Sequence, residues 1–149
     1  MSESLAGTGP LPAQGHAKLR FAGYAAVFGH PDNGGDVILP GAFAASLEKG
    51  LAVPLLWQHQ PGRVIGRIEH LSEDKRGLRV IAALDGGGDG AKAAGLLSRG
   101  RIDGLSFGYR VRDSARKEGL RELRELELVE VSLVAKPMQK LARVHAVEG

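Results

Sequence analysis

Short apolar stretches separated by turn signals recur along the chain from residue 18 onward, and they predict a protein built mainly of strands. Residues 18–28 have the pattern of a strand with a small irregularity near Gly23. A dense turn signal at 30–36 is followed by a short apolar piece at 37–39. Further strands are predicted at residues 53–59, 63–71, 78–84 and 102–111, with either a strand pair or one bent strand at 120–135.

Two segments have the spacing of short helices. Residues 42–49 place Phe43 and Leu47 four positions apart, and Gly50 follows as a terminator. Residues 91–99 form the second predicted helix, with two buried leucines near its end and a glycine after it.

A glycine-rich run at residues 85–90 precedes the second predicted helix. It lacks the lysine and the hydroxyl residue of a P-loop, and its spacing fits no dinucleotide-binding fingerprint. We therefore interpret the run as a flexible loop.

The strands predicted between residues 53 and 84 are joined by short turns at 60–62 and 73–77, which favours a meander of neighbouring antiparallel strands. With two short helices added, the pattern predicts an α+β fold, a curved, barrel-like and mainly antiparallel β-sheet. The chain of 149 residues corresponds to a single domain, which we place at 18–147. Residues 1–17 are aperiodic and are expected to form a disordered tail.

Composition removes several classes of function. Hydrophobic residues make up 43% of the chain but aromatic residues only 5%, so the core is expected to be aliphatic. There is no cysteine, which excludes disulfides, cysteine nucleophiles and thiolate metal sites, and no motif calls for a cofactor or a metal. No apolar run is long enough for a membrane helix, and the N-terminus lacks the features of a signal peptide.

The net charge of +3 is small, and basic residues alternate with acidic ones in the last third of the chain, as in Arg121, Glu122, Arg124 and Glu125. This alternation is typical of a solvated strand face, whereas nucleic-acid binders usually carry a basic stripe with interleaved aromatic residues. We therefore expect neither nucleic acid nor a membrane as a partner.

One segment carries a candidate nucleophile, Gly104-Leu105-Ser106-Phe107-Gly108. On a strand, Ser106 and Gly108 share one face, and the glycine is expected to leave the hydroxyl exposed to a substrate backbone. The same letters match the G-x-S-x-G elbow of α/β-hydrolase esterases. That elbow needs a helix directly after the serine, whereas here the pattern continues as a strand. An esterase is therefore kept only as an alternative.

A serine nucleophile needs a base, and His59 is the best placed of the five histidines. It closes the apolar strand 53–59 just before the predicted turn, so its ring is expected at the rim of the core, half buried and reachable. The other four lie in the tail, in a turn, at a strand end or near the chain end, and they are His16, His30, His70 and His145.

Two glutamates are candidates for the acid that would orient this base. Strict alternation from Leu126 to Val134 puts Glu130 on a largely apolar face, where an unpaired carboxylate is costly and an imidazolium is a suitable partner. Glu127 falls on the opposite face among charged neighbours and is expected to be solvated. If the strand phase is off by one residue, Glu127 takes the place of Glu130.

Five segments spread over most of the chain form a set. They are FAGYAAVF at 21–28, DVILPGAF at 36–43, LWQH at 56–59, GLSFGY at 104–109 and EVSLVAKP at 130–137. In this order they resemble the tailed-phage prohead maturation proteases. The resemblance implies a serine endopeptidase with a fold related to the herpesvirus assemblins. It also implies that His59 is the base, Ser106 the nucleophile and Glu130 the acid of a catalytic triad.

By the same resemblance, the substrates are the major capsid protein precursor and its scaffold segment, cleaved inside the assembling procapsid in the bacterial cytoplasm. A homo-oligomer is compatible with it. The loop at 136–140 is the expected oxyanion site, although Met138-Gln139 replaces the usual pair of small residues there.

The mechanism requires His59 and Ser106 to approach within about 2.6–3.2 Å, or somewhat more without substrate, and we expect this to need neighbouring strands. The alternative from another functional class is a non-catalytic barrel that binds scaffold or assists capsid assembly.

Overall fold

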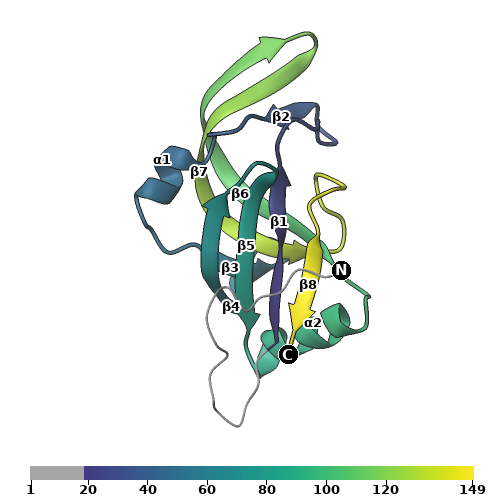
Figure 1. The fold of residues 1–149 in the computed structure, drawn as a ribbon. Helices are drawn as coiled ribbons and strands as arrows, with labels where there is room; N and C mark the ends of the chain where they lie inside the picture. The colour runs from purple at the N-terminus through teal and green to yellow at the C-terminus, as the bar shows by residue number, and fades with distance from the viewer. Residues whose placement is uncertain (1–18) are drawn as a thin grey trace.

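Eight strands form a single curled sheet in the computed structural model, which describes residues 19–149 (Figure 1). Within these residues the elements are, in chain order, β1 (Arg20–Val27), β2 (Asp36–Ile38), α1 (Ala44–Glu48), β3 (Pro54–Trp57), β4 (Gln60–Glu73), β5 (Gly77–Leu84), α2 (Gly88–Ser98), β6 (Gly104–Lys117), β7 (Leu120–Val134) and β8 (Val144–Glu148). The strand order is β2-β7-β3-β4-β5-β1-β8, and β6 pairs with β7 outside this path. The α+β class and the curved, mainly antiparallel sheet are confirmed. The tail expected at 1–17 lies outside the described residues.

Strand β7 is the most connected strand of the sheet, because it pairs with β2, β3 and β6. β6 runs antiparallel to it from one end to the other. β2 and β3 run parallel to it, β2 at residues 121–123 and β3 at residues 131–133. Residues 120–135 were predicted to form either a strand pair or one bent strand, and the structure shows one strand there.

The predicted antiparallel meander of β3, β4 and β5 is confirmed, but its first turn lies two residues earlier than expected. Trp57 pairs with Gln60, so Gln58 and His59 form the turn, and residues 60–62 belong to β4. Leu56, which precedes Trp57 in β3, pairs with Val64. Pro61 therefore lies in an irregular stretch of β4 and has no partner in β3. A proline is tolerated there because no ladder hydrogen bond is lost.

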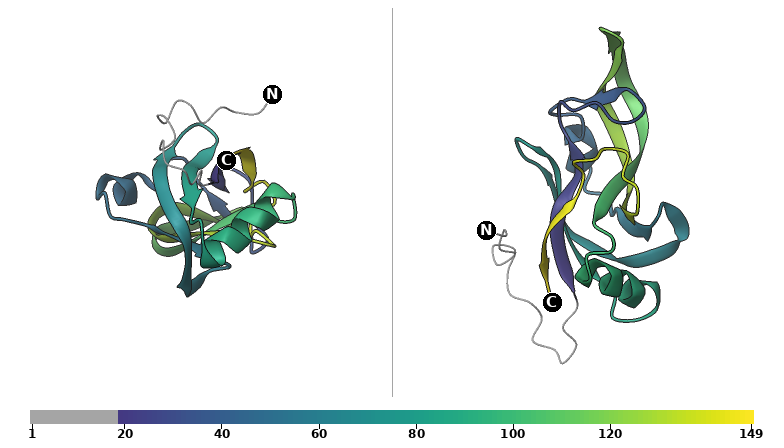
Figure 2. Two further views of the ribbon diagram at one scale, coloured as in Figure 1. Left: turned by 90° about the horizontal axis from the view of Figure 1, so that it is seen from below. Right: turned by 90° about the vertical axis from the view of Figure 1, so that its right-hand side faces the viewer.

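Both helices are confirmed with shifted boundaries. α1 covers 44–48 rather than 42–49. α2 begins at Gly88 rather than at residue 91, so the flexible loop predicted at 85–90 is wrong in its second half. A Cβ on Gly90 would lie 2.6 Å from the carbonyl oxygen of Ile65, so this glycine lets α2 approach β4 closely. α2 lies across one end of the curled sheet and buries Leu97 there (Figure 2).

The last strand, β8, was not predicted. It is short, it pairs antiparallel with β1, and only Ala146 of its residues is buried, so its hydrophobic pattern is weak. The irregularity expected near Gly23 is confirmed in this pairing, since the register shifts between Ala22 and Gly23. A Cβ on Gly23 would lie 2.5 Å from the carbonyl oxygen of Arg143.

The curl of the sheet encloses a core that is mostly aliphatic, as the composition predicted. Phe21 and Phe43 are its fully buried aromatic residues. Its largest fully buried aliphatic side chains come from β3, β4, β5, β6 and β7 and are Leu55, Ile65, Leu78, Leu84, Leu105, Leu123, Leu126 and Leu133. Ile81 belongs to a separate small cluster with Ala22 and Ala146. The core therefore joins the strands that carry the candidate site.

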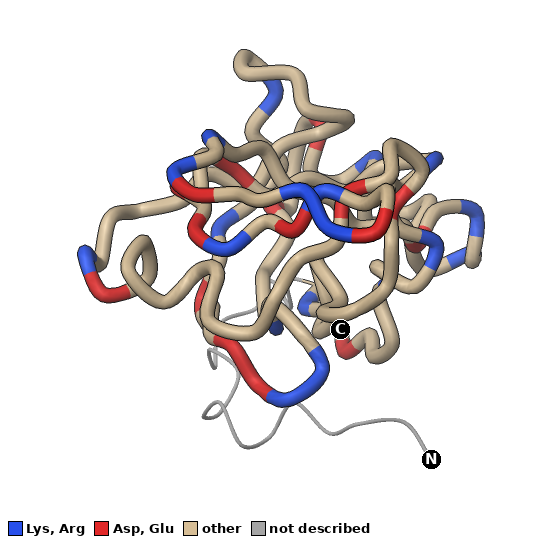
Figure 3. Tube along the Cα trace, turned by 90° about the horizontal axis from the view of Figure 1, so that it is seen from above, with Lys and Arg blue, Asp and Glu red and all other residues tan. Residues whose placement is uncertain are grey.

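The distal halves of β6 and β7 form an arm that projects beyond the rest of the sheet (Figures 1 and 2). Seen from above, Lys and Arg positions are interspersed with Asp and Glu positions (Figure 3). Close to the β6–β7 turn, the Arg121 guanidinium donates to both oxygens of Asp36, at 2.9 and 2.7 Å, and so ties β2 to β7. Charge on the arm thus serves strand pairing.

Candidate active site

The site residues predicted from the sequence come from three strands that meet at Ser132 of β7. Ser132 pairs with Leu56 of β3 on one side and with Ser106 of β6 on the other. β7 therefore lies between the strand that leads to His59 and the strand that carries Ser106, and the expectation that these two strands are neighbours is wrong. His59 extends beyond the end of β3 instead, and it lines the same cavity as Ser106.

The turn that carries His59 has a strained backbone. Gln58 and His59 both lie in the left-handed region, with φ of 50° and 61°. For residues other than glycine this costs roughly 1–2 kcal/mol each. Non-glycine residues in such conformations cluster at functional sites, where the surrounding structure holds them.

Hydrogen bonds to β7 hold this turn in place. The Gln58 N–H donates to the carbonyl oxygen of Leu133 at 3.0 Å, and the His59 N–H donates to Ser132 Oγ at 3.0 Å. The Gln58 side chain adds a third contact, because its Oε1 accepts from the Ala135 N–H at 3.0 Å. The turn is thus fastened to β7 through both backbone and side chains, which fixes the position of the histidine.

His59, Glu130 and Ser132 form a closed ring of hydrogen bonds. The His59 ring bonds through Nδ1 to Glu130 Oε1. Ser132 Oγ donates to the other carboxylate oxygen, Glu130 Oε2, at 2.6 Å, and accepts from the His59 backbone N–H. An ionised carboxylate can only accept, so Nδ1 carries the proton and Nε2 is left as the basic nitrogen. The Glu130 side chain is 9% exposed and that of His59 is 45% exposed, so the ring joins a buried acid to a reachable base.

A β-bulge changes the strand phase before Glu130. Gly108 pairs with Glu130 and Tyr109 with Leu128, which leaves Val129 as the extra residue of β7. Leu128 and Val131 both belong to the core, so strict alternation from 126 to 134 was wrong. Glu130 therefore lies on the face opposite Val131 rather than in the middle of an apolar face.

Gly108 makes room for the carboxylate. A Cβ at this position would lie 2.7 Å from Glu130 Oε1 and 3.0 Å from its Cγ. The other flanking glycine, Gly104, makes room for the chain after β7, since its Cβ would lie 2.6 Å from the carbonyl oxygen of Val134 and 2.9 Å from Pro137 Cδ. The two glycines around Ser106 thus serve the packing of β7.

Ser106 itself is only 7% exposed, so the expectation of an exposed hydroxyl is wrong. Its strand continues to Lys117 without the helix that an α/β-hydrolase elbow requires, which rules out that alternative. Because Ser106 lines a cavity, a substrate that enters the cavity still reaches the residue.

The cavity has a volume of about 290 Å³ and is lined mostly by apolar side chains, together with the candidate catalytic groups. The residues around it are Ala25, Asp32, Ile38, His59, Leu105, Ser106, Phe107, Tyr109, Lys136, Met138 and Gln139. Burial, and after it the charges of Asp36 and Asp32, raises the pKa of Tyr109, so this phenol stays a neutral donor in the wall. Such a pocket can accept an apolar group of a ligand beside His59 and Ser106.

The two serines that face each other across β6 and β7 have different environments. Ser132 is 0% exposed, and its hydroxyl is engaged both as donor and as acceptor. Among the hydrogen bonds within residues 19–149, none joins the His59 ring to Ser106 Oγ. Their approach in the presence of substrate stays a prediction, and Ser106 is the better candidate nucleophile because it lines the cavity.

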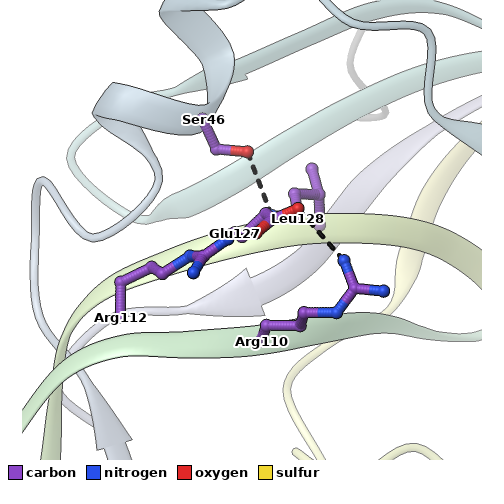
Figure 4. Close-up of polar contacts among 5 residues, drawn as sticks. All are labelled: Ser46, Arg110, Arg112, Glu127 and Leu128. Atoms are coloured by element: carbon purple, nitrogen blue, oxygen red, sulfur yellow. Dashed lines mark hydrogen bonds and ion pairs between the residues drawn. The ribbon is translucent and has the colours of Figure 1, made fainter.

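Glu127 lies on the surface of the arm, away from this cavity. Its carboxylate pairs with the guanidinium groups of Arg112 and Arg110, the latter at 3.1 Å (Figure 4). The hydrogen bond from Arg112 is the main reason that the pKa of Glu127 lies below its ordinary value. The bulge at Val129 thus leaves Glu130 beside the histidine, and Glu127 is held by arginines instead.

Two other described histidines, His70 and His145, have partners elsewhere. His70 bonds through Nε2 to Ser72 Oγ at 2.9 Å, and the His145 ring lies 5.6 Å from that of Tyr24. His16 lies outside the described residues. Within residues 19–149 no group of three or more His, Asp or Glu is arranged to hold a metal ion, and no helix is long and apolar enough to span a membrane.

The sequence predicted no supporting role for three residues that hold the site together, namely Gln58, Ser132 and Gln139. The available signal was their position in the sequence, since Gln58 directly precedes His59 and Ser132 follows Glu130 by two residues. Gln58 was not recognised as part of the turn because the turn was predicted at 60–62. Gln139 is buried and clamps the end of β1, because its side chain accepts from the Val27 N–H at 2.8 Å and donates to the carbonyl oxygens of Val27 and His30.

Known proteins resemble this chain in both sequence and fold. A profile of the caudovirus prohead serine proteases matches residues 10–149. The prohead protease of Enterobacteria phage HK97 is 38% identical over 96 residues, which cover 61% of this chain and 42% of that protein. The chain therefore spans less than half the length of this relative.

Among solved structures, the capsid assembly protease of bacteriophage T4 aligns with a TM-score of 0.68 and 18% identity, over 85% of this chain and 88% of that one. The KSHV protease, solved with a hexapeptide phosphonate inhibitor, aligns with a TM-score of 0.60 and 14% identity, over 89% and 65%. The varicella-zoster virus protease gives 0.56 and 16%, over 87% and 64%. The expected relation to the herpesvirus protease fold is confirmed.

Proposed function

The chain belongs to the caudovirus prohead serine proteases, and we propose that it is a serine endopeptidase with Ser106 as nucleophile, His59 as general base and Glu130 as the orienting acid. The observation that carries this proposal is the pairing of a buried carboxylate with a reachable histidine, beside a cavity that the serine also lines. A carboxylate that holds Nδ1 and leaves Nε2 basic is the arrangement of serine hydrolase triads.

In the proposed reaction, His59 Nε2 takes the proton of Ser106 Oγ as the oxygen attacks the carbonyl carbon of a peptide bond. The tetrahedral intermediate collapses when Nε2 passes this proton to the departing amine, which leaves an acyl-serine. Water then attacks the acyl group with the same base, and Ser106 regains its proton. Glu130 stays ionised throughout and stabilises the imidazolium.

We propose that the loop at 136–140 supplies backbone N–H groups to the oxyanion. Lys136, Met138 and Gln139 line the cavity. The loop is tied to the chain after β1, since Gln139 bonds to Val27 and the Asn33 N–H donates to the carbonyl oxygen of Met138 at 3.1 Å. The buried amide of Gln139 thus gives a structural reason for this residue in place of a small one.

The proposed substrates are the major capsid protein precursor and its scaffold segment, and the proposed place of action is the interior of the assembling procapsid in the bacterial cytoplasm. Such substrates are protein chains, which fits a nucleophile on a strand beside a largely apolar cavity. Assembly of the chain into a homo-oligomer is compatible with this function.

The test is labelling of the purified chain with a fluorophosphonate, followed by co-expression with the capsid precursor. Wild type is expected to be labelled at one serine and to process the precursor, whereas Ser106→Ala does neither and His59→Ala is labelled far more slowly. Ser114→Ala is the matched control, because Ser114 lies on the same strand but does not line the cavity. Absence of labelling and processing in folded wild type would instead support the non-catalytic binding module.

A further inference from the structure

Ser132 occupies a position that neither the family resemblance nor the triad assigns to it. It is fully buried, and its hydroxyl connects the backbone of the His59 turn to the carboxylate of Glu130. We propose that Ser132 is a positioning residue that fixes the orientation of the His59 ring toward Ser106. This inference rests on the proposed function, since it concerns the efficiency of the same histidine.

The closed ring of hydrogen bonds fixes the histidine at two points. The bond from the His59 N–H to Ser132 Oγ holds the backbone of the residue, while the bond between Nδ1 and Glu130 Oε1 holds its side chain. Ser132 Oγ joins these two points because it also donates to Glu130 Oε2. Rotation of the carboxylate or of the ring therefore requires breaking a bond on Ser132 Oγ or on Nδ1.

Removal of the hydroxyl would release both points together. The His59 N–H would lose its acceptor in a turn with left-handed backbone, and Glu130 Oε2 would lose its donor in a buried position. Both changes let the ring depart from its orientation without removing a group that touches substrate. A misplacement of about 1 Å in a catalytic constellation costs on the order of 10²-fold in rate, so we expect a loss of kcat of about 10- to 100-fold.

Another serine offers a matched control for a purely structural hydroxyl. Ser46 Oγ accepts from the Leu128 N–H of the same strand β7 at 3.0 Å, and Ser46 does not line the cavity (Figure 4). Ser46→Ala is therefore expected to lower the unfolding temperature somewhat and to leave kcat unchanged.

The experiment measures the rate of fluorophosphonate labelling of Ser106 and the kcat and KM for a peptide substrate, with unfolding temperatures recorded for each variant. Ser132→Ala is expected to lower kcat and the labelling rate by about 10- to 100-fold with little change in KM. Ser132→Cys keeps the volume of the side chain but donates only weakly, and it is expected to show the same loss as Ser132→Ala. It is the control for an effect of the small cavity left by alanine.

A double-mutant cycle with Glu130→Gln separates positioning from general destabilisation. If Ser132 acts through Glu130 and His59, the loss in the double variant is clearly smaller than the product of the two single losses. A histidine-specific ¹⁵N NMR spectrum adds an independent readout, because wild type should show a single Nδ1–H tautomer of His59 and Ser132→Ala a mixture.

Wild-type kcat and labelling in folded Ser132→Ala and Ser132→Cys, or fully multiplicative losses in the cycle, would overturn this inference and leave the proposed function intact. Unlabelled wild type would overturn both. If the alanine variant does not fold, the kcat, the labelling rate and the histidine NMR spectrum of Ser132→Cys decide the matter.

Discussion

Gly108→Ala tests the geometry of the site without replacing any residue of the proposed triad. Gly108 faces Glu130 across β6 and β7, and an added Cβ would lie 2.7 Å from Oε1 and 3.2 Å from the carboxyl carbon. The carboxylate cannot swing aside freely, because His59 and Ser132 hold its two oxygens. The new methyl group must therefore push the carboxylate, and with it the histidine.

The magnitude follows from these distances. Ordinary contact with a Cβ begins at 3.4 Å, so relief of the closest contact requires a shift of about 0.7 Å. Since about 1 Å of misplacement costs on the order of 10²-fold in rate, kcat is expected to fall by roughly 10- to 100-fold. Overpacking should also destabilise the fold by roughly 1–3 kcal/mol, a fall of several degrees in unfolding temperature.

The assay compares fluorophosphonate labelling and peptide cleavage at 20 °C, about room temperature and below the unfolding transition. Gly62→Ala is the matched control, because Gly62 is also a strand glycine but has nothing within 4 Å of the added Cβ. It is expected to retain full activity. Wild-type activity in Gly108→Ala would refute the claim that this glycine exists to accommodate the carboxylate.

Two further changes have signs that follow from the charges in the structure. Glu130→Gln should reduce kcat by up to roughly 10⁴-fold with the fold intact. Glu127→Gln only breaks the ion pairs with arginines on the arm, so it should leave kcat unchanged. An inactive Glu127 variant beside an active Glu130 variant would reverse the assignment. The hydrogen bond from Arg121 lowers the pKa of Asp36 below 3.8, so the pair stabilises the fold above the unfolded pKa and this stabilisation is lost as the pH falls through the folded pKa. Thermal unfolding should therefore show a deficit for Asp36→Asn at pH 7 that shrinks toward about pH 3, and an equal deficit at both pH values would contradict the assignment.

The sequence predicted those features that depend on local pattern. The strands of the meander, the glycine-terminated helices and the aliphatic core all follow from the order of apolar and polar residues, and the structure confirms them. β8 was not predicted because only one of its residues is buried, so its local hydrophobic pattern is weak. Its formation depends on pairing with β1, which lies far away in the sequence.

The sequence could name the residues of the candidate site, but it predicted their geometry less well. Ser106, His59 and Glu130 were identified from motifs, but strict alternation cannot reveal the bulge at Val129 that sets the phase of Glu130. Likewise, Gln60-Pro61-Gly62 carries the residues of a turn, whereas Gln58 and His59 adopt the turn at a cost in backbone strain. That cost is compensated by hydrogen bonds to β7, which no local pattern contains.

The parallel pairing of β3 with β7 has a consequence for when the residues of the proposed triad come together. It joins Leu55 to Val131, so a long stretch of chain must be ordered before the histidine meets its carboxylate. Closure of such loops is slow compared with the formation of hairpins, and the β6–β7 hairpin forms from adjacent residues. A chain still leaving the ribosome lacks β7 when β3 is already made, so it holds no assembled triad. In the proposed mechanism the base therefore meets its acid only after the segment that carries β7 has been synthesised and has paired with β3.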